Sequence, residues 1–476
     1  MKRKYKVTLS VVASVALVAG ASAYFAFGYS KKHAETKSYT IGDGASVKVG
    51  ILSDTQLPSG GRSDSSQITA LKSTLEYLKN QQVEAIILAG DFTDLGTKSA
   101  WQSFKDTYDG VFSDNKPVPV FAMGNHDYWL PMFKDCFEIA TPAKMQKRFT
   151  SYTGEYPYSH KVINGFHFIV WSSSDGSYDL SYNDDKWIRA QLDAAVADTP
   201  GKPIFVITHL HPSDTVYGSD DWGNKDIYNV LKDYPQVVSF SGHSHYALCD
   251  ERSVWQGEFT AINTQTTDYI ELESGKFNGT IPVDAYGNDA CHYPTCMIMD
   301  VNSEKITINR VAVNSGESIK EPWVIGAPFG DKSSFTYTSE ARIKSNTAPY
   351  FTGESDIGIY NEKDKDGKAI SVIKFNAAAD DDFVHSYRLE FLDENGTALP
   401  FTETKYDGAE KENAKEINKI EYFSDFALGL DKMSQKSALR LPDNIPGAAV
   451  KIRITAMDTW GKESNSIEAI IAEATK

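Results

Sequence analysis

The chain has 476 residues, of which 41% are hydrophobic and 12% aromatic, so it can bury at least two ordinary cores. Its formal net charge of −16 argues against general nucleic-acid binding, because contact with a phosphate backbone requires neutralising Lys and Arg side chains. Four cysteines in so long a chain do not make a disulfide scaffold. Cys291 and Cys296 are close enough in sequence to bridge within one loop, but the sequence leaves that pairing open.

The N-terminal segment has the pattern of an export signal. A basic head that begins at Lys2 precedes a low-charge apolar run from Val7 to Tyr29, and Ala21-Ser22-Ala23 matches an A-x-A cleavage site. The run continues past that site and is long enough to span a bilayer, so residues 1–30 are predicted to be either a signal peptide or an N-terminal membrane anchor. Both alternatives predict an extracytoplasmic protein, which is either secreted or anchored to the cell membrane.

From Ser46 to about Lys276 the sequence alternates between strand and helix patterns. Residues 47–52 form a short apolar strand pattern, and Leu71, Leu75 and Leu78 follow at the spacing of a buried helical stripe. Such alternation is typical of an α/β fold. Further strands are predicted at residues 85–89, 118–123, 165–171, 204–208 and 237–241, and helices after residue 97, at 184–197 and at 226–234.

The stretch from Ala85 to Asp94 is the centre of this pattern. Residues 85–89 have the length and apolar character of a buried parallel strand, and Asp91 and Asp94 stand just beyond it. Because ligands of an open α/β sheet bind outside the carboxyl ends of its strands, both acids are candidate site residues. An Asp94 that merely caps the next helix would fit this local sequence equally well.

The same pattern recurs at four other predicted strand ends, where side chains with oxygen or imidazole metal-ligand atoms follow directly after an apolar run. Carboxylate, amide oxygen and imidazole together suit Mn, Fe, Zn or a similar divalent ion. The five groups are Asp54 with Gln56, Asp91 with Asp94, Asn125 with His126 and Asp127, His209 with His211, and His243 with His245.

In content, order and spacing these motifs resemble those of the calcineurin-like metallophosphoesterase superfamily, over about Ser46 to Ala327. The resemblance implies a four-layer αββα sandwich, in which two mixed β-sheets pack face to face with helices outside. It also implies two divalent transition metal ions, for which Mn, Fe and Zn are the candidates. By this resemblance Asp91 would bridge the ions, Asp54, Gln56 and His245 would complete the first set, and Asn125, His209 and His243 would complete the second.

The resemblance also implies a reaction. A hydroxide that bridges the two ions would attack phosphorus, while the ions neutralise the charge that gathers on the phosphoryl oxygens. His126 would be the general acid that protonates the leaving alkoxide, held in orientation by Asp94. The expected partner is therefore a phosphate-ester substrate.

Two positions depart from the usual pattern of these relatives. Gln56 stands where His is common, and its amide oxygen is a harder and generally weaker ligand, which favours a harder metal or a more labile first site. His209 directly continues its strand, but His211 is an alternative ligand two residues further on. The sequence leaves the choice between these two histidines open.

Alternating β patterns separated by turns replace the α/β pattern from Ala348 onward. Residues 31–345 are therefore predicted to be the catalytic domain with its linker, and residues 346–476 an all-β sandwich domain. The final strands have a weaker resemblance to a fibronectin type III or Ig-like module. This module is a candidate for binding cell-surface components.

Together these patterns predict an exported, metal-dependent phosphoesterase. The alternatives are a phosphodiesterase that acts on cyclic nucleotides or on lipid or cell-wall diesters, and a non-catalytic cell-surface binding protein that retains the fold. Intact Asp91 and His126 favour the enzyme. The substrate is not identified, but the loop from Asp214 to Asn224 contains Tyr217 and Trp222, which suit either stacking on a nucleoside or sugar or packing in the core.

Overall fold

The computed structural model describes residues 33–60, 65–129, 141–176, 182–271, 294–353, 356–364, 366–403, 406–407, 410–411, 415–424 and 436–471. The predicted signal peptide or anchor, residues 1–30, lies outside this part of the chain, as does Cys291. Within the described ranges, no helix is both long and apolar enough to cross a membrane. Export and membrane anchoring stay predictions.

The chain folds into two compact units that are discontinuous in sequence. The predicted site residues from Asp54 to His243 belong to the first unit, whereas His245 belongs to the second. The first unit comprises Met1–Ser244, Ser253–Asp268 and Pro294–Thr338, and the second comprises His245–Arg252, Tyr269–Tyr293 and Ser339–Lys476.

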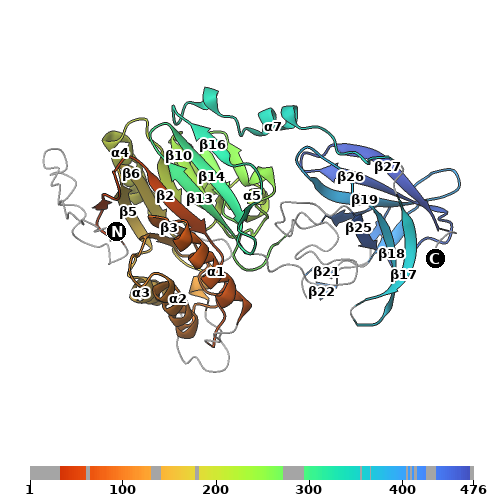
Figure 1. Cartoon of the computed structure of the whole chain (residues 1–476), viewed down its shortest axis with the longest axis horizontal. Coiled ribbons are helices and arrows are strands. Elements are labelled where there is room, and N and C mark those ends of the chain that lie inside the picture. The colour runs from red at the N-terminus through yellow and green to blue at the C-terminus, as the bar shows by residue number, and fades with distance from the viewer. Residues whose placement is uncertain are drawn as a thin grey trace. The chain divides into compact units, whose positions relative to one another are not determined.

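Two mixed β-sheets form the centre of the first unit (Figure 1). In one sheet the strand order is β15-β14-β13-β2-β3-β4, and β16 also pairs with β14. Strands β2, β3 and β4 are parallel, and β13 runs antiparallel to β2. The bounds are β2 (Val47–Leu52), β3 (Ala85–Ala89), β4 (Val118–Ala122), β13 (Thr295–Val301), β14 (Lys305–Ala312), β15 (Glu317–Ser318) and β16 (Trp323–Gly326).

The other sheet has the strand order β1-β5-β6-β7-β10-β12-β11. Strands β6, β7, β10 and β12 are parallel neighbours, which is the arrangement expected from the alternating pattern. The bounds are β1 (Lys37–Tyr39), β5 (Tyr158–Ile163), β6 (Phe166–Trp171), β7 (Ile204–Ile207), β10 (Val237–Ser241), β11 (Val254–Gln256) and β12 (Thr260–Asn263).

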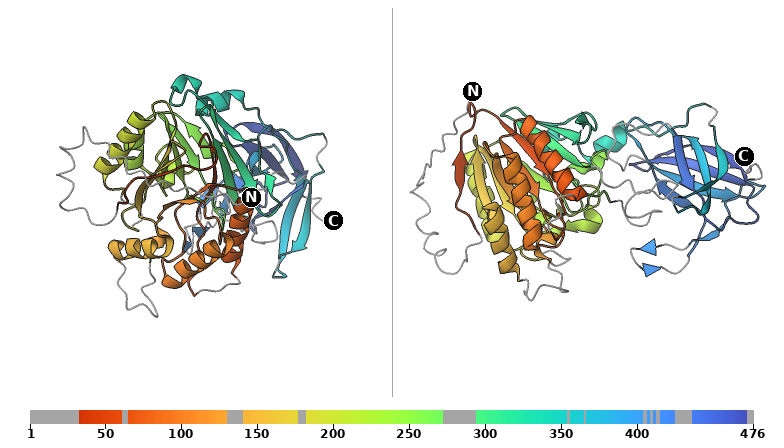
Figure 2. Two further views of the ribbon diagram at one scale, coloured as in Figure 1. Left: turned by 60° about the vertical axis from the view of Figure 1, so that its left-hand side comes forward. Right: turned by 60° about the horizontal axis from the view of Figure 1, so that its bottom comes forward.

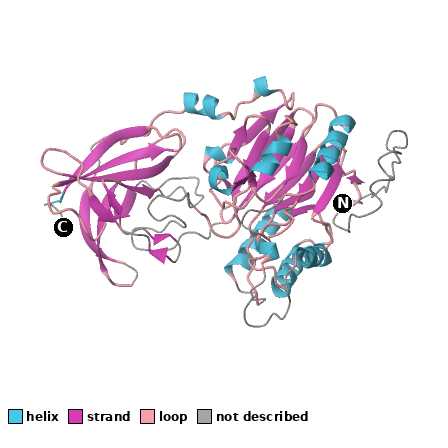
Figure 3. Cartoon of the chain, turned by 180° about the vertical axis from the view of Figure 1, so that it is seen from behind, coloured by secondary structure: helices cyan, strands magenta, loops and turns pink. Residues whose placement is uncertain are grey.

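Helices cover the outer faces of the two sheets, which confirms the predicted metallophosphoesterase sandwich. Helices α1, α2 and α3 share one apolar cluster with the first sheet, and α4 and α6 share another with the second sheet. Figure 1 shows α1, α2 and α3 grouped together, and Figure 3 shows helices lying over the strands on the reverse side. The bounds are α1 (Ser66–Asn80), α2 (Lys98–Val111), α3 (Pro142–Thr153), α4 (Asp185–Asp198), α5 (Ser219–Trp222) and α6 (Lys225–Leu231).

Local sequence explains where these helices begin and which face they bury. The side chain of Ser65 accepts a hydrogen bond from the backbone N–H of Ile68 and so caps α1, and Thr97 caps α2 in the same way. The predicted stripe of α1, which includes Leu71 and Leu75, is fully buried against the first sheet. Capping and stripe together fix both the start and the rotation of each helix.

Strands β13 and β14 form an antiparallel hairpin beside β2. Cys296 in β13 is a buried thiol with no disulfide partner among the described residues, and its pairing with Cys291 stays open because Cys291 lies outside them. Burial raises the pKa of this thiol well above its usual range, which keeps it uncharged and inert.

The second unit is dominated by a β-sandwich (Figure 2). A three-stranded sheet, β17-β18-β25, and a four-stranded sheet, β24-β19-β26-β27, share one apolar core, in which the rings of Phe375 and Tyr387 meet edge to face at 4.9 Å. The likeness to a fibronectin type III module and the binding of cell-surface components stay predictions. The bounds are α7 (Ser339–Ser345), β17 (Gly358–Lys363), β18 (Ala369–Asn376), β19 (Val384–Leu392), β20 (Phe401–Glu403), β21 (Tyr406–Asp407), β22 (Glu410–Lys411), β23 (Lys415–Ile417), β24 (Ile420–Phe423), β25 (Lys436–Arg440), β26 (Lys451–Asp458) and β27 (Glu463–Ile470).

The segment His245–Arg252 is held inside the second unit by ionic contacts. Arg252 binds both carboxylate oxygens of the fully buried Asp250, with its shortest contact at 2.7 Å, and approaches Nε2 of His385 at 3.2 Å. Arg342 in α7 donates to the carbonyl oxygen of Glu251 at 2.7 Å and also pairs with the Glu251 carboxylate. These contacts connect the segment His245–Arg252 to residues that lie 91 and 133 positions further along the chain.

Two buried histidines, His160 and His167, join the β5–β6 hairpin to α4 through side chains of that helix. The ring of His160 lies 2.8 Å from Oε1 of Gln191 and 2.8 Å from Nδ1 of His167, and Nε2 of His167 lies 3.1 Å from a carboxylate oxygen of Asp198. These contacts give His167 a structural role. Burial lowers the pKa of His160 to about 4.

Replacing His160 with Gln is expected to reduce the acid sensitivity of the fold. The pKa of His160 is about 4 in the folded protein and about 6.5 in the unfolded chain, so the unfolded state binds more protons between these values. Stability therefore falls as the pH drops through this window. Between pH 7 and pH 4, wild type should lose about 1–3 kcal/mol more than the variant in urea unfolding with a chelator present. Equal losses in the two proteins would contradict this assignment.

Candidate metal centre

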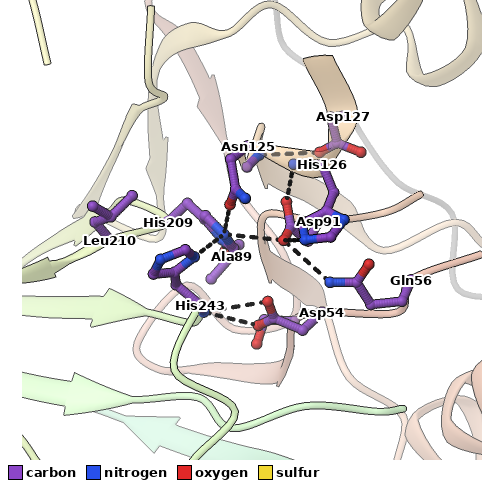
Figure 4. Close-up of polar contacts among 12 residues, drawn as sticks. Asp54, Gln56, Ala89, Asp91, Asn125, His126, Asp127, His209, Leu210 and His243 are labelled. Carbon is purple, nitrogen blue, oxygen red and sulfur yellow. Dashed lines mark hydrogen bonds and ion pairs between the residues drawn. The ribbon is translucent and has the colours of Figure 1, made fainter. Parts of the chain in front are cut away.

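Loops after five strands bring six predicted ligands together at the carboxyl ends of the two sheets (Figure 4). Each of these side chains follows a buried apolar strand within four residues, so the strands deliver the polar groups to one place. Asp54 and Gln56 follow β2, Asp91 follows β3, Asn125 follows β4, His209 follows β7, and His243 follows β10.

Asp91 is the central carboxylate of this group. Its Oδ2 lies 3.2 Å from Nε2 of His209 and accepts a hydrogen bond of 3.2 Å from the side-chain amide of Gln56, while its Oδ1 accepts one of 2.9 Å from the backbone N–H of His126. Burial alone would raise the pKa of Asp91, but the neighbouring His209 and His126 hold it well below its usual range. Asp91 is therefore an ionised carboxylate buried at the point where the loops meet.

His209 directs one ring nitrogen into the group. Its Nδ1–H donates to the carbonyl oxygen of Ala89 at 2.8 Å, and its Nε2 lies 2.9 Å from Oδ1 of Asn125 and 3.2 Å from Nδ1 of His243. Ligand atoms of Asp91, His209 and His243 all lie within 4.8 Å of one another. One N–H at Nε2 cannot bond to three acceptors at once, whereas a cation can contact them all, so this donor set fits a divalent ion.

Asp54 and Gln56 lie on the other side of Asp91. Both carboxylate oxygens of Asp54 accept a hydrogen bond of 3.2 Å from the backbone N–H of His243. The side-chain oxygen Oε1 of Gln56 is buried and has no hydrogen-bond partner among the residues that the structure describes. A buried amide oxygen without a partner is costly, and a second divalent ion would satisfy it. It is the amide N–H of Gln56 that faces Asp91, however, so the oxygen would reach an ion held by Asp91 only if the amide turned over, and the ligand role of Gln56 stays a prediction.

Glycines beside the ligands permit this close packing. A Cβ at Gly124 would lie 2.1 Å from Oδ1 of Asp91, and one at Gly242 would lie 2.2 Å from Oδ2 of Asp54. The ligands also adopt strained backbone conformations, with φ of 51° at Asp54, 52° at Asp91 and 73° at His243. Left-handed non-glycine residues are uncommon and gather at functional sites, so this strain is a second mark of the site.

His126 lies next to the ligand group and not within it. Its Nδ1 is 2.8 Å from the backbone carbonyl oxygen of Asp94 and 3.4 Å from the Asp94 carboxylate, and its Nε2 is 4.0 Å from Oδ2 of Asp91. The ring of Trp129 covers it at a centroid distance of 4.0 Å. Burial would lower the pKa of His126, but Asp91 and Asp94 raise it to about 9. Asp94 therefore holds His126 mainly through its backbone oxygen.

Asp127 supports the site, although the sequence pattern gave it no role. Its Oδ1 accepts hydrogen bonds of 3.1 Å from both the backbone N–H and the hydroxyl of Thr93, and its Oδ2 accepts one of 3.0 Å from the N–H of Gly124. This fully buried side chain ties the loop after β3 to the loop after β4. In the sequence, only its position directly after Asn125 and His126 indicates that Asp127 belongs to the site.

His211, the alternative ligand, lies outside the group. Its Nδ1 is 2.7 Å from the hydroxyl of Ser241 and its Nε2 is 2.9 Å from the hydroxyl of Ser244, so both ring nitrogens are engaged. Burial lowers the pKa of His211 to about 3, which keeps the ring neutral. The geometry therefore favours His209 over His211 as the ligand.

His245 belongs to the second unit. Its ring Nδ1 lies 2.9 Å from the carbonyl oxygen of Tyr269, and the two rings approach at a centroid distance of 4.3 Å. The backbone of His245 is left-handed, with φ of 56°. Its predicted part in the first ion site stays a prediction.

Three solved structures resemble this chain at low identity. The first is the purple acid phosphatase PPD1 from yellow lupin (Lupinus luteus) seeds, which is 12% identical, with 61% of this chain and 56% of that chain covered and a TM-score of 0.40. The second is Vacuolar Protein Sorting 29 from Cryptosporidium parvum, which is 13% identical, with 59% of this chain and 99% of that chain covered and a TM-score of 0.30. The third is Vps29 from Entamoeba histolytica, which is 13% identical, with 59% of this chain and 99% of that chain covered and a TM-score of 0.28. The chain thus spans little more than half the length of the phosphatase. A search of curated proteins gave no match.

The two sheets with their outer helices have the mixed α/β fold of metallophosphoesterases. Residues 47–247 match the family model of the calcineurin-like phosphoesterases. The chain therefore carries a calcineurin-like phosphoesterase domain, and the resemblance expected from the strand-end motifs is confirmed.

Gly124→Ala is expected to impair metal binding more than folding. The new methyl group would meet the Asp91 carboxylate at 2.1 Å, so Asp91 must move away from His209. Metal titration calorimetry should show an affinity loss of about tenfold or more, since displaced ligands typically cost that much. Gly110→Ala is the matched control, because a Cβ there meets nothing within 4 Å in helix α2. Unchanged affinity in Gly124→Ala would argue against the assignment of Asp91.

Proposed function

We propose that this protein is a metal-dependent phosphoesterase that hydrolyses phosphate esters with the help of two divalent transition metal ions, of which Mn, Fe and Zn are the candidates. The convergence of Asp91, His209 and His243 within 4.8 Å carries this proposal. The buried Oε1 of Gln56, which has no hydrogen-bond partner among the described residues, would be a ligand for a second ion once the amide turns its oxygen toward Asp91.

The described side chains divide into two ligand sets that share Asp91. One oxygen of its carboxylate, Oδ2, contacts both the side-chain amide of Gln56 and Nε2 of His209, so Asp91 is suited to contribute to both ion sites. When bound, the ions would supply Lewis acidity, which activates water and stabilises charge on phosphoryl oxygens. One set would be Asp54, Gln56 and Asp91, to which the sequence adds His245, and the other would be Asp91, Asn125, His209 and His243.

The charge balance of these ligands favours an anionic substrate. Asp54 and Asp91 are the two carboxylates, whereas the remaining ligands in the described part of the site are neutral amides and imidazoles. Two dications would therefore leave an excess of about two positive charges in a buried, low-dielectric place, where such an excess attracts anions strongly. A hydroxide nucleophile would reduce this excess to about one, so the charge balance favours anionic esters without separating monoesters from diesters.

His126 is suited to donate the proton that a leaving alkoxide requires. Its Nδ1 is taken by the carbonyl oxygen of Asp94, which leaves Nε2 to carry the transferable proton. Asp91 and Asp94 raise the pKa of His126 to about 9, so the ring is protonated at neutral pH. Cations bound at Asp91 would lower this value, which brings it closer to the range that suits a general acid.

Hydrolysis of phosphate esters by metal-loaded protein tests the proposed function. Purified protein loaded with Mn, Fe or Zn should hydrolyse monoesters, diesters or both, whereas Asp91→Asn should retain less metal and lose nearly all turnover, because a neutral amide cannot hold two dications together. Metal content and initial rates are measured on the same samples. Full metal content with wild-type rates in Asp91→Asn would overturn the proposal, as would a loaded wild type that is inactive on both ester classes.

His126→Ala is expected to keep its metal but to slow alkyl ester hydrolysis by about a hundredfold or more, the scale of general acid catalysis. A nitrophenyl ester should suffer little, since its leaving group departs without a proton. Asp94→Ala is the matched control and should cost less, because the backbone oxygen that holds His126 at 2.8 Å remains. Equal losses on both esters, or loss of metal from His126→Ala, would make His126 a ligand instead of the acid.

A further inference from the structure

Trp222 stands beside the metal centre with an unusual degree of exposure. Its ring meets that of His243 edge to face, at a centroid distance of 5.4 Å and an angle of 79°. It is 40% exposed, and among the described residues of the first unit the only other large hydrophobic side chain so exposed is Val324, at 42%. Single exposed apolar side chains are common on proteins, so the contact with His243 is what distinguishes Trp222.

The loop that carries Trp222 is held in one conformation by its own hydrogen bonds. The two-residue strands β8 (His211–Pro212) and β9 (Gly223–Asn224) pair in parallel and close it. Within the loop, the N–H of Thr215 donates to the hydroxyl of Ser219 at 2.7 Å, and the N–H of Trp222 donates to the carbonyl oxygen of Gly218 at 2.8 Å. A Cβ at Gly223 would lie 2.0 Å from the carbonyl oxygen of Ser219, so the turn after Trp222 is closely packed.

The same loop is fixed to the strand ends of the metal centre. His211 begins it and is held between the hydroxyls of Ser241 and Ser244, which lie on either side of His243 in the sequence. The hydroxyl of Tyr182 accepts the backbone N–H groups of His209 and Leu210 at 3.0 and 3.1 Å. The indole is therefore held in place relative to His243 before any ligand arrives, which lowers the entropic cost of binding.

We propose that Trp222 is a specificity-determining residue that binds a flat aromatic ring in the ester group of the substrate. This inference rests on the proposed phosphoesterase function, because a phosphoryl group at His243 would place the ester substituent near the indole. A preorganised indole next to a charged centre can make a ring-to-ring contact with an aromatic substituent of the ester. With a saturated ring of the same size it can make only an apolar contact. Trp222 therefore favours aryl-bearing esters, such as those with a benzyl group or a nucleobase.

Benzyl phosphate and cyclohexylmethyl phosphate form a matched pair of substrates for the test, because they differ in the flatness of one ring and have similar leaving alcohols. Wild type should prefer the benzyl ester in kcat/KM. Trp222→Ala should reduce that preference by about three- to tenfold, the scale of one aromatic pair, and Trp222→Phe should retain most of it. Val324→Ala, which removes an equally exposed side chain from β16, should leave the preference unchanged.

Binding of benzylphosphonate and cyclohexylmethylphosphonate, measured by calorimetry, provides a readout that needs no turnover. A preference for the benzyl compound that falls in Trp222→Ala, with metal content and circular dichroism unchanged, supports the proposal. Identical ester and phosphonate preferences in wild type and Trp222→Ala overturn it while leaving the phosphoesterase function intact. A wild type that hydrolyses neither ester but hydrolyses other phosphate esters leaves the proposed function intact; Trp222-dependent benzylphosphonate binding then still supports the subsite, and the absence of such binding overturns it. Loss of metal from both Trp222 variants would make Trp222 a support of His243 and overturn the specificity role.

Discussion

The burial of the Asp91 carboxylate is the constraint on which the rest of the site depends. An ionised carboxylate that is only 1% exposed is costly unless positive charge and hydrogen-bond donors surround it. The described structure supplies His209, the side-chain amide of Gln56 and the backbone N–H of His126, and each comes from a different strand end. Satisfying one charge therefore fixes the mutual positions of several loops. The left-handed backbone of Asp91 and the required glycine at position 124 follow from the same crowding.

The sequence predicted the parts of the structure that depend on short-range patterns. Strands at residues 47–52, 85–89 and 237–241 are observed with the predicted bounds, because each is a short apolar run with a polar residue or glycine directly after it. The ligands were predictable for the same reason, since a metal donor at the end of a buried strand is visible from its neighbours alone. Parallel pairing then places these strand ends together without further information.

What the sequence did not show depends on contacts between distant residues. His209 and His211 are alike in local sequence, and only the hydroxyls of Ser241 and Ser244, about thirty residues away, show that His211 is structural. Likewise, the sequence around residue 245 does not show that this segment belongs to the same unit as the β-sandwich. That assignment depends on long-range contacts such as the one between Arg252 and His385, which are 133 positions apart. Such long-range pairs carry no periodicity, so a pattern read along the chain misses them.

In the first unit the proposed metal ligands and the residue proposed to contact the substrate lie in loops with different supports. Gly124 and Gly242 pack directly against the carboxylates of Asp91 and Asp54, so a methyl group added at either glycine would displace a proposed ligand. The loop from His211 to Asn224 is different, because its own turns and the β8–β9 pair support it. Residues such as Trp222 can therefore change while His211 still anchors the loop to the site. An arrangement of this kind allows the specificity of the site to diverge while the metal chemistry stays fixed.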